Sequence, residues 1–135
     1  MLLRDLERIL SKIVLPVKDA EAKLVNSSIP AGESATIDIH ATDRTAVLIT
    51  VRVTYTDTAT AGVRVIWLYS PDGTNYDTEE DAIIEGNYFE PSFSAGETRQ
   101  RSVIVPFVSP YLRFVVRNLD TANAVTVSLW TTLVK

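Results

Sequence analysis

The sequence contains no cysteine and only one histidine, His40. Disulfides and thiolate metal sites are therefore excluded, and a zinc site would have to be completed by carboxylates alone. A serine nucleophile would have to use His40 as its base, and no nucleophile-elbow pattern accompanies that histidine. We expect His40 to face solvent near a strand end, and we expect no cofactor.

Positive charge is also scarce, since 13 basic residues stand against 17 acidic ones and the formal net charge is −4. The sequence lacks the dense Lys/Arg stripe that binds a phosphate backbone, so we expect no nucleic-acid partner. No Gly-rich phosphate loop precedes a helix. With 135 residues, 46% of them hydrophobic, the chain fits one domain without a cleft-forming insertion. We therefore expect a protein that is not an enzyme.

Long apolar runs are absent as well. The apolar N-terminus is interrupted by Arg4, Asp5, Glu7, Arg8 and Lys12. It therefore has neither a signal-peptide core nor the run of about 20 apolar residues that spans a bilayer. We expect no membrane partner and a soluble, cytoplasmic location, or the virion if the chain is viral. The single methionine and single glutamine are typical of a heat-loving source.

The first residues have helical periodicity. Apolar side chains recur at spacings of three and four, which predicts an amphipathic helix, and Pro16 ends the pattern. Such a short helix is marginal alone in water, so its stripe must pack on its own domain or on another molecule. The following residues look like an extended arm, which favours self-association or docking. The stripe comprises Leu3, Leu6, Ile9, Leu10 and Ile13.

After residue 22 the pattern changes to β-branched alternation with regular turn signals. We therefore divide the chain into a helix and arm, 1–22, and a β-domain, 23–135. Short strands with no helix between them predict an antiparallel sandwich, either a jelly roll or an immunoglobulin-like Greek key. The expected strands are 23–29, 34–40, 45–55, 62–70, 86–93, 98–108, 110–118 and 124–134.

One expected strand, 62–70, is apolar on both faces, because Ile66 and Leu68 lie opposite its other apolar residues. We expect the arm or a neighbouring molecule to cover them, and we assign them to oligomerisation or docking. Trp130 is expected to lie among hydroxyl side chains, where it would stack on a sugar ring, anchor an interface, or be covered by the arm. Tyr76 and Tyr88 are further candidate aromatics for a ligand or an interface.

Two pairs of segments resemble each other. "IPAGESATIDI" from Ile29 resembles "FSAGETRQRSVIV" from Phe93, and "DTATAGVRVIW" (57–67) resembles "DTANAVTVSLW" (120–130). The offsets, 64 (96 − 32) and 63 (120 − 57), are nearly equal. They indicate two similar units, from duplication or from convergent turns, joined by the segment 70–92.

That joining segment contains the acidic stretch "SPDGTNYDTEEDA" (70–82). Its oxygen ligands would suit a hard cation, with Asp72, Asp77, Glu79 and Asp81 as weak metal candidates. The spacing does not match a calcium-binding helix–loop–helix, however, since Gly73 directly follows Asp72. Pro-Asp-Gly predicts a tight turn instead, and the acids would keep an exposed connection hydrated.

The stretch "YSPDGTNYDT" (69–78) resembles the Asp-box hairpin of sialidase-type propellers, although it lacks the residue between Asp and Gly. The resemblance implies that Ser70, Asp72 and Tyr76 brace a hairpin. In its layout, an apolar helix and arm before a sandwich that ends in "VTVSLWTTLVK", the chain resembles small accessory proteins of tailed phages and archaeal viruses. That resemblance implies a homo-oligomer, often a trimer, or docking on a capsid or tail protein. A carbohydrate-binding module is the alternative.

Overall fold

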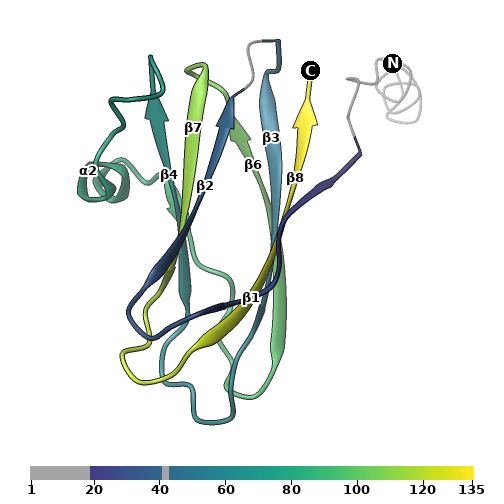
Figure 1. Cartoon of the computed structure of the whole chain (residues 1–135), viewed down its shortest axis with the longest axis vertical. Helices are drawn as coiled ribbons and strands as arrows, with labels where there is room; N and C mark the ends of the chain where they lie inside the picture. Colours follow the sequence, from purple (N-terminus) through teal and green to yellow (C-terminus); the bar gives the residue numbers. More distant parts are fainter. Residues whose placement is uncertain (1–18, 41–42) are drawn as a thin grey trace, which may run out of the picture.

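The computed structural model describes residues 19–40 and 43–135 (Figure 1). These residues form the expected all-β domain, with eight strands and one short helix, α2 (Glu79–Ile84). The strands are β1 (Glu21–Ile29), β2 (Ser34–His40), β3 (Ala46–Thr54), β4 (Val63–Ser70), β5 (Tyr88–Phe89), β6 (Thr98–Pro106), β7 (Tyr111–Asn118) and β8 (Val125–Val134).

The strands form two four-stranded antiparallel sheets, which makes the domain a β-sandwich. Sheet A has the order β1-β8-β3-β6, and sheet B has the order β2-β7-β4-β5. Strands pair in a nested way, first with last, second with seventh, third with sixth and fourth with fifth. This is the pairing of a jelly roll. In an immunoglobulin sandwich the first and last strands belong to different sheets.

The core lies between the sheets because most strands alternate apolar and polar residues. In β3, the inward-facing Val47, Ile49, Val51 and Val53 are all 0% exposed. The other residues of β3 face outward and are half-buried or exposed. Phe114 of β7 packs opposite them, and each such side chain contributes about 1.5–3 kcal/mol when it leaves water.

The two similar segments correspond to a shift of four strands. Replacing each strand of sheet A by the strand four places along the cyclic order gives sheet B read from its other edge: β1 becomes β5, β8 becomes β4, β3 becomes β7 and β6 becomes β2. The turns of the two similar units also make equivalent hydrogen bonds. Asn118 donates its backbone N–H to the carbonyl of Glu33 (2.9 Å), and Tyr55 donates to that of Glu97 (3.0 Å). The sequence offset thus reflects a structural repeat.

Two sequence expectations about the connection after β4 are wrong. The predicted strand 86–93 shrinks to two paired residues, and a helix, α2, interrupts the strands. The signal for α2 is present in the sequence, because Thr78 caps it by accepting a hydrogen bond from the backbone of Asp81 (3.1 Å). A Thr followed three residues later by an acid is a recognised helix start.

The predicted N-terminal helix, with Leu3, Leu6, Ile9, Leu10 and Ile13, lies outside the described residues. The described chain begins just before β1, whose first residue, Glu21, pairs with Thr131 near the C-terminus. The chain therefore enters sheet A at the end of the sandwich where it also leaves. The α-helical part that is described, α2, is not long and apolar enough to cross a membrane.

Candidate functional site

The outer face of sheet B is covered by the protein's own connection between β4 and β5. Ile66 and Leu68 are 1% and 5% exposed, and they form a second apolar cluster with Val115 of β7 and Ala82 of α2. Tyr76 packs against the same cluster. The assignment of Ile66 and Leu68 to docking, with the arm or a neighbouring molecule as their cover, is therefore wrong.

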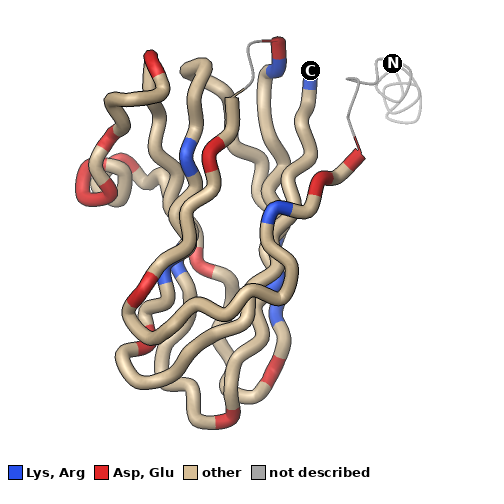
Figure 2. Tube along the Cα trace, in the orientation of Figure 1, with Lys and Arg blue, Asp and Glu red and all other residues tan. Residues whose placement is uncertain are grey.

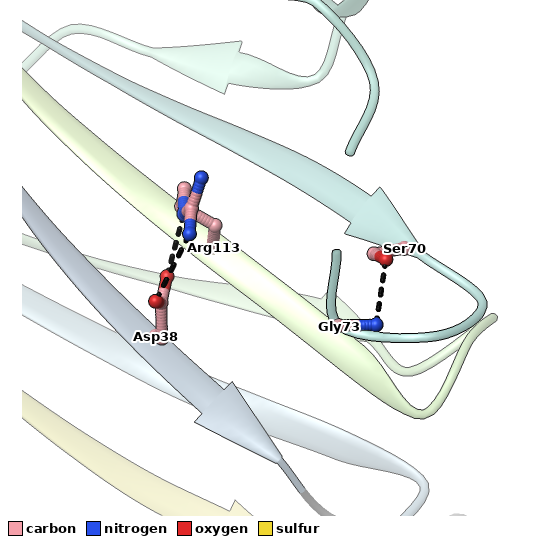
Figure 3. Close-up of polar contacts among 4 residues, drawn as sticks. All are labelled: Asp38, Ser70, Gly73 and Arg113. Atoms are coloured by element: carbon pink, nitrogen blue, oxygen red, sulfur yellow. Dashed lines mark hydrogen bonds and ion pairs between the residues drawn. The ribbon is translucent and has the colours of Figure 1, made fainter. Parts of the chain in front are cut away.

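The turn that starts this connection is held by side chains that accept backbone hydrogen bonds. Ser70 Oγ accepts from the N–H of Gly73 at 2.9 Å (Figure 3). Asp72 Oδ1 accepts from the N–H groups of Thr74 (2.9 Å) and Asn75 (2.8 Å). These bonds favour the charged carboxylate and hold the pKa of Asp72 well below its usual range. Ser70 and Asp72 thus brace the turn as the Asp-box resemblance implies.

Gly73 fits this turn for two reasons. Its φ is +77°, a conformation that residues with a Cβ rarely adopt. A Cβ at this position would also lie 2.9 Å from the ring of Tyr111. The same ring stacks on His40 with 4.2 Å between centroids. His40 is exposed at the end of β2, as expected.

The four weak metal candidates belong to different local contacts. Asp72 closes the turn, and Asp77 Oδ2 accepts a long hydrogen bond from the backbone of Tyr69 (3.4 Å). Glu79 receives two hydrogen bonds of 2.9 Å from Arg117. Asp81 lies in the first turn of α2, where Figure 2 shows acidic residues gathered. Over residues 19–40 and 43–135, no three acidic, His or Cys side chains group to hold a metal ion.

Each of the three candidate aromatics carries an arginine over its ring. The guanidinium lies on one side of the ring, and the contact is a cation–π interaction. Each arginine is also tied to a neighbouring acceptor, Asp38, Glu90 or Gln100. The distances to the ring centroids are 3.9 Å for Arg113 over Tyr76, 5.4 Å for Arg64 over Tyr88 and 5.3 Å for Arg52 over Trp130.

Of these arginines, Arg113 on sheet B makes a double hydrogen bond to its acceptor. It donates from Nε to Asp38 Oδ1 (2.6 Å) and from Nη2 to Oδ2 (3.1 Å) across the β2–β7 pair (Figure 3). This two-fold contact lowers the pKa of Asp38 and raises that of Arg113, because each group stabilises the charged form of the other. Arg113, Asp38 and Tyr76 thus form a surface cluster in which Arg113 is paired with Asp38 and lies over the ring of Tyr76.

The outer face of sheet A is different, because no other element of the described chain packs on it. Over its polar half, cross-strand pairs bond side chain to side chain. Thr54 pairs with Thr98 (3.0 Å), and Thr50 pairs with Ser102 (2.9 Å). Arg52 donates to Gln100 (3.0 Å) between these rows. This half is a hydroxyl-rich surface whose side chains hydrogen-bond to one another across the strands.

Toward the end where the chain enters and leaves, the same face becomes apolar. Leu48 lies opposite Ile104, and Ala46 lies between Pro106 and Val134. Ile104 is 67% exposed, which is high for a strand isoleucine. The sheet A patch is defined as Ala46, Leu48, Ile104, Pro106, Trp130 and Val134.

One buried carboxylate was missed by sequence reasoning. Asp120, 2% exposed, accepts backbone hydrogen bonds from Thr60, Ala122 and Asn123 at 2.8–2.9 Å. These bonds hold its pKa well below the usual range. Asp120 ties together the loops that contain the two similar Asp-Thr-Ala stretches, and that repetition was the signal that could have found it. Its role is structural.

The sequence matches no protein-family model and no curated protein sequence. Among solved structures, the chain is similar to part of a family GH115 4-O-methyl-α-glucuronidase with specificity for decorated arabinogalactans. The two are 12% identical with a TM-score of 0.47, and the match covers 85% of this chain but only 16% of that one. A likeness at this level carries no inference about activity.

Proposed function

We propose that this chain is a non-enzymatic structural protein that assembles into a homo-oligomer through its N-terminal helix and arm. One observation carries the proposal: the sandwich closes its own core and covers the outer face of β4 with its own α2. The apolar stripe expected in residues 1–18 therefore has no interior position to fill in the described domain. Because so short a helix needs a packing surface to be stable, a surface contact must supply it.

The edges of the sheets support a helix-mediated contact over direct strand pairing. An open edge strand invites pairing with another copy, and natural proteins blunt such edges. Strand β6 carries Arg99 and Arg101 at inward-facing positions, opposite the buried Val53 and Val51. Strand β1 has two register irregularities, and β5 is only two residues long. Three of the four edges are thus poorly suited to pairing with another sheet.

The resemblance to accessory proteins of viruses supplies the setting of this proposal. Such proteins form symmetric assemblies, and the helix and arm would then also dock on a capsid or tail protein. The jelly roll is compatible with this setting, since viral capsid domains use it, but lectin domains use it too. The fold therefore supports a structural role without selecting it, and the choice depends on the surfaces.

The alternative, a carbohydrate-binding module, is less well supported by those surfaces. A sugar ring stacks on an open aromatic face, and the faces of Trp130, Tyr76 and Tyr88 each carry an arginine. On that side of each ring, a sugar would have to displace a guanidinium that is already hydrogen-bonded.

Light scattering tests the proposal. We expect the full chain to have the mass of an oligomer and a chain lacking residues 1–18 to be a monomer with an unchanged circular dichroism spectrum. In the full chain, Leu6→Glu with Leu10→Glu should dissociate the oligomer as the deletion does. Glu7→Lys, on the polar face of the same helix, is the matched control and should retain the mass. A monomeric full chain, or an oligomer that survives the deletion, would contradict the proposal.

A further inference from the structure

The sheet A patch offers the N-terminal helix an apolar surface on which to pack. Its rows are contiguous by register, because Leu48 lies between Ile104 and Thr132, and Ala46 lies between Pro106 and Val134. Trp130 lies one row below, diagonal to Leu48 and within reach of its side chain. Contiguous apolar surface on an otherwise polar face is typical of an interaction site.

The chain enters the domain beside this patch. Ala22 pairs with Trp130, and Glu21 pairs with Thr131, so β1 begins beside the row of the patch that contains Trp130, at the end of sheet A where both termini lie (Figure 1). Neighbouring strands are about 4.8 Å apart, which places Leu48 on β3 roughly 10 Å from β1. The arm therefore delivers the helix to this end of sheet A.

The dimensions of the two apolar surfaces agree. The stripe from Leu3 to Ile13 spans ten residues of helix, which is about 15 Å. The patch from the row of Trp130 to that of Val134 spans four strand residues, which is about 14 Å. One helix can thus cover the patch along its length.

The proposed homo-oligomer decides which copy of the helix occupies the patch. Residues 14–20, "VLPVKDA", contain Pro16 and Asp19 but no Gly, Asn or Ser, so their composition does not select one copy over the other. Pro16 favours an extended backbone in the residue before it. Seven extended residues span up to about 23 Å, more than the distance from β1 to the patch of the same chain. A connection of this length allows the helix to reach the patch of a second molecule, which is the occupant that the proposed homo-oligomer requires.

We propose that the apolar stripe of residues 3–13 docks on the sheet A patch of a second copy, so that the copies exchange arms. This rests on the proposed function and adds to it the receiving surface. Reciprocal exchange closes a two-fold dimer, whereas exchange around a ring closes a trimer or a larger cyclic assembly. In either case Ile104 and Leu48 receive the helix, and Trp130 anchors its edge.

The first test compares two exposed isoleucines in the full chain. Ile104 of the patch is 67% exposed, and Ile84 of α2, beside sheet B, is 73% exposed. We expect Ile104→Glu to convert the oligomer into a monomer by light scattering, with at least a tenfold rise in dissociation constant. Ile84→Glu is the matched control and should leave the mass unchanged. An Ile104→Glu variant that retains the oligomer overturns the inference.

The second test separates exchange between copies from docking within one copy. Leu6→Glu with Leu10→Glu disables the helix, and Ile104→Glu disables the patch. When the two variants are mixed, the intact helix of one meets the intact patch of the other, so native mass spectrometry should show a species containing both. A mixture that stays monomeric at millimolar concentration overturns arm exchange.

The outcomes also distinguish this inference from the proposed function. If loss of the helix dissociates the oligomer and Ile104→Glu does not, the helix docks elsewhere: the inference fails and the function stands. If the full chain is itself a monomer, both fail.

Discussion

The outer faces of the two sheets both carry apolar residues, but they differ in whether the described chain covers those residues. Sheet B has apolar residues on its outer face at Ile66, Leu68 and Val115, and the chain covers them with α2 and Tyr76. Sheet A has apolar residues on its outer face at Leu48 and Ile104, and no described element covers them. Both faces look alike in sequence, as strand positions that break the alternation of apolar and polar residues.

The difference lies in the connection that follows each central strand. Strand β4 is followed by a connection of seventeen residues (71–87), which is long enough to hold a turn and a helix. Strand β3 is followed by a shorter loop, from Thr54 to Val63, which stays at the end of the sandwich. An apolar outer face therefore indicates that another segment or molecule covers it. The length of the neighbouring connection decides whether the same chain provides that cover.

The largest expected effect comes from removing the same side chain from both faces. Ile66→Ala leaves a cavity under α2 and should lower the free energy of unfolding by about 2–5 kcal/mol. Ile104→Ala, in the same chain, should change it by at most about 0.5 kcal/mol, because that side chain is exposed. Urea unfolding should be measured with Leu6→Glu and Leu10→Glu present, so that assembly does not contribute. Equal losses would contradict the contrast between the faces.

The next effect concerns the turn that positions the cover of sheet B. Gly73→Ala places a Cβ at φ +77° against the Tyr111 ring, and should cost about 2–4 kcal/mol. Gly32→Ala is the matched control in the β1–β2 turn, with φ +71° but no atom within 4 Å of the added Cβ. It should cost only about 1–2 kcal/mol. Thermal unfolding compares them, and equal costs would show that Tyr111 moves aside.

A smaller effect should separate the arginines of the two faces. Arg113→Met removes a double hydrogen bond to Asp38 and a close contact with Tyr76, and should cost about 1 kcal/mol. Arg52→Met on sheet A removes a single bond to Gln100 and a longer contact with Trp130, and should cost ~0.5 kcal/mol. Methionine retains the apolar stem in both. Urea midpoints compare them, and a larger loss at Arg52 would reverse the ranking.

The smallest effect is the part of the pH dependence of stability that comes from Asp38 on sheet B. Asp38 has a folded-state pKa below its unfolded value of about 3.9, so its contribution to stability is present above about pH 4 and declines as the pH falls further. Asp38→Asn and Arg113→Met should both flatten the fall of the urea midpoint between about pH 5 and pH 2. Arg52→Met should keep the wild-type slope, because Gln100 does not titrate. A flattened slope in that control would assign the dependence to other groups.

Most of the strands could be read from the sequence because each has one buried and one wet face. The expected 34–40 matches β2, and the expected 62–70 and 124–134 differ from β4 and β8 by a residue at the start. The connection after β4 could not be read in the same way. There, the aromatic residues Tyr88 and Phe89 are typical of a strand, but they are the two residues that pair with β4. The local signal for α2 is the capping residue Thr78.

The candidate site was predicted less completely, because partners on distant strands cannot be seen in the sequence. Ser70 and Asp72 bond to residues close by in sequence, so their bracing role followed from a local motif. Arg113 and Asp38 are 75 residues apart, and only the β2–β7 register brings them together. The same holds for the arginines that cover the candidate aromatics.

The sequence by itself determined the all-β class, the positions of the strands and the acidic turn at Ser70, because alternation and turn chemistry act between near neighbours. The tertiary structure alone decided that the sheets form a jelly roll, that α2 and not the arm covers Ile66 and Leu68, and that Ile104 stays open. Those outcomes depend on which distant surfaces meet. An apolar side chain specifies that it must be buried, but it does not specify by what.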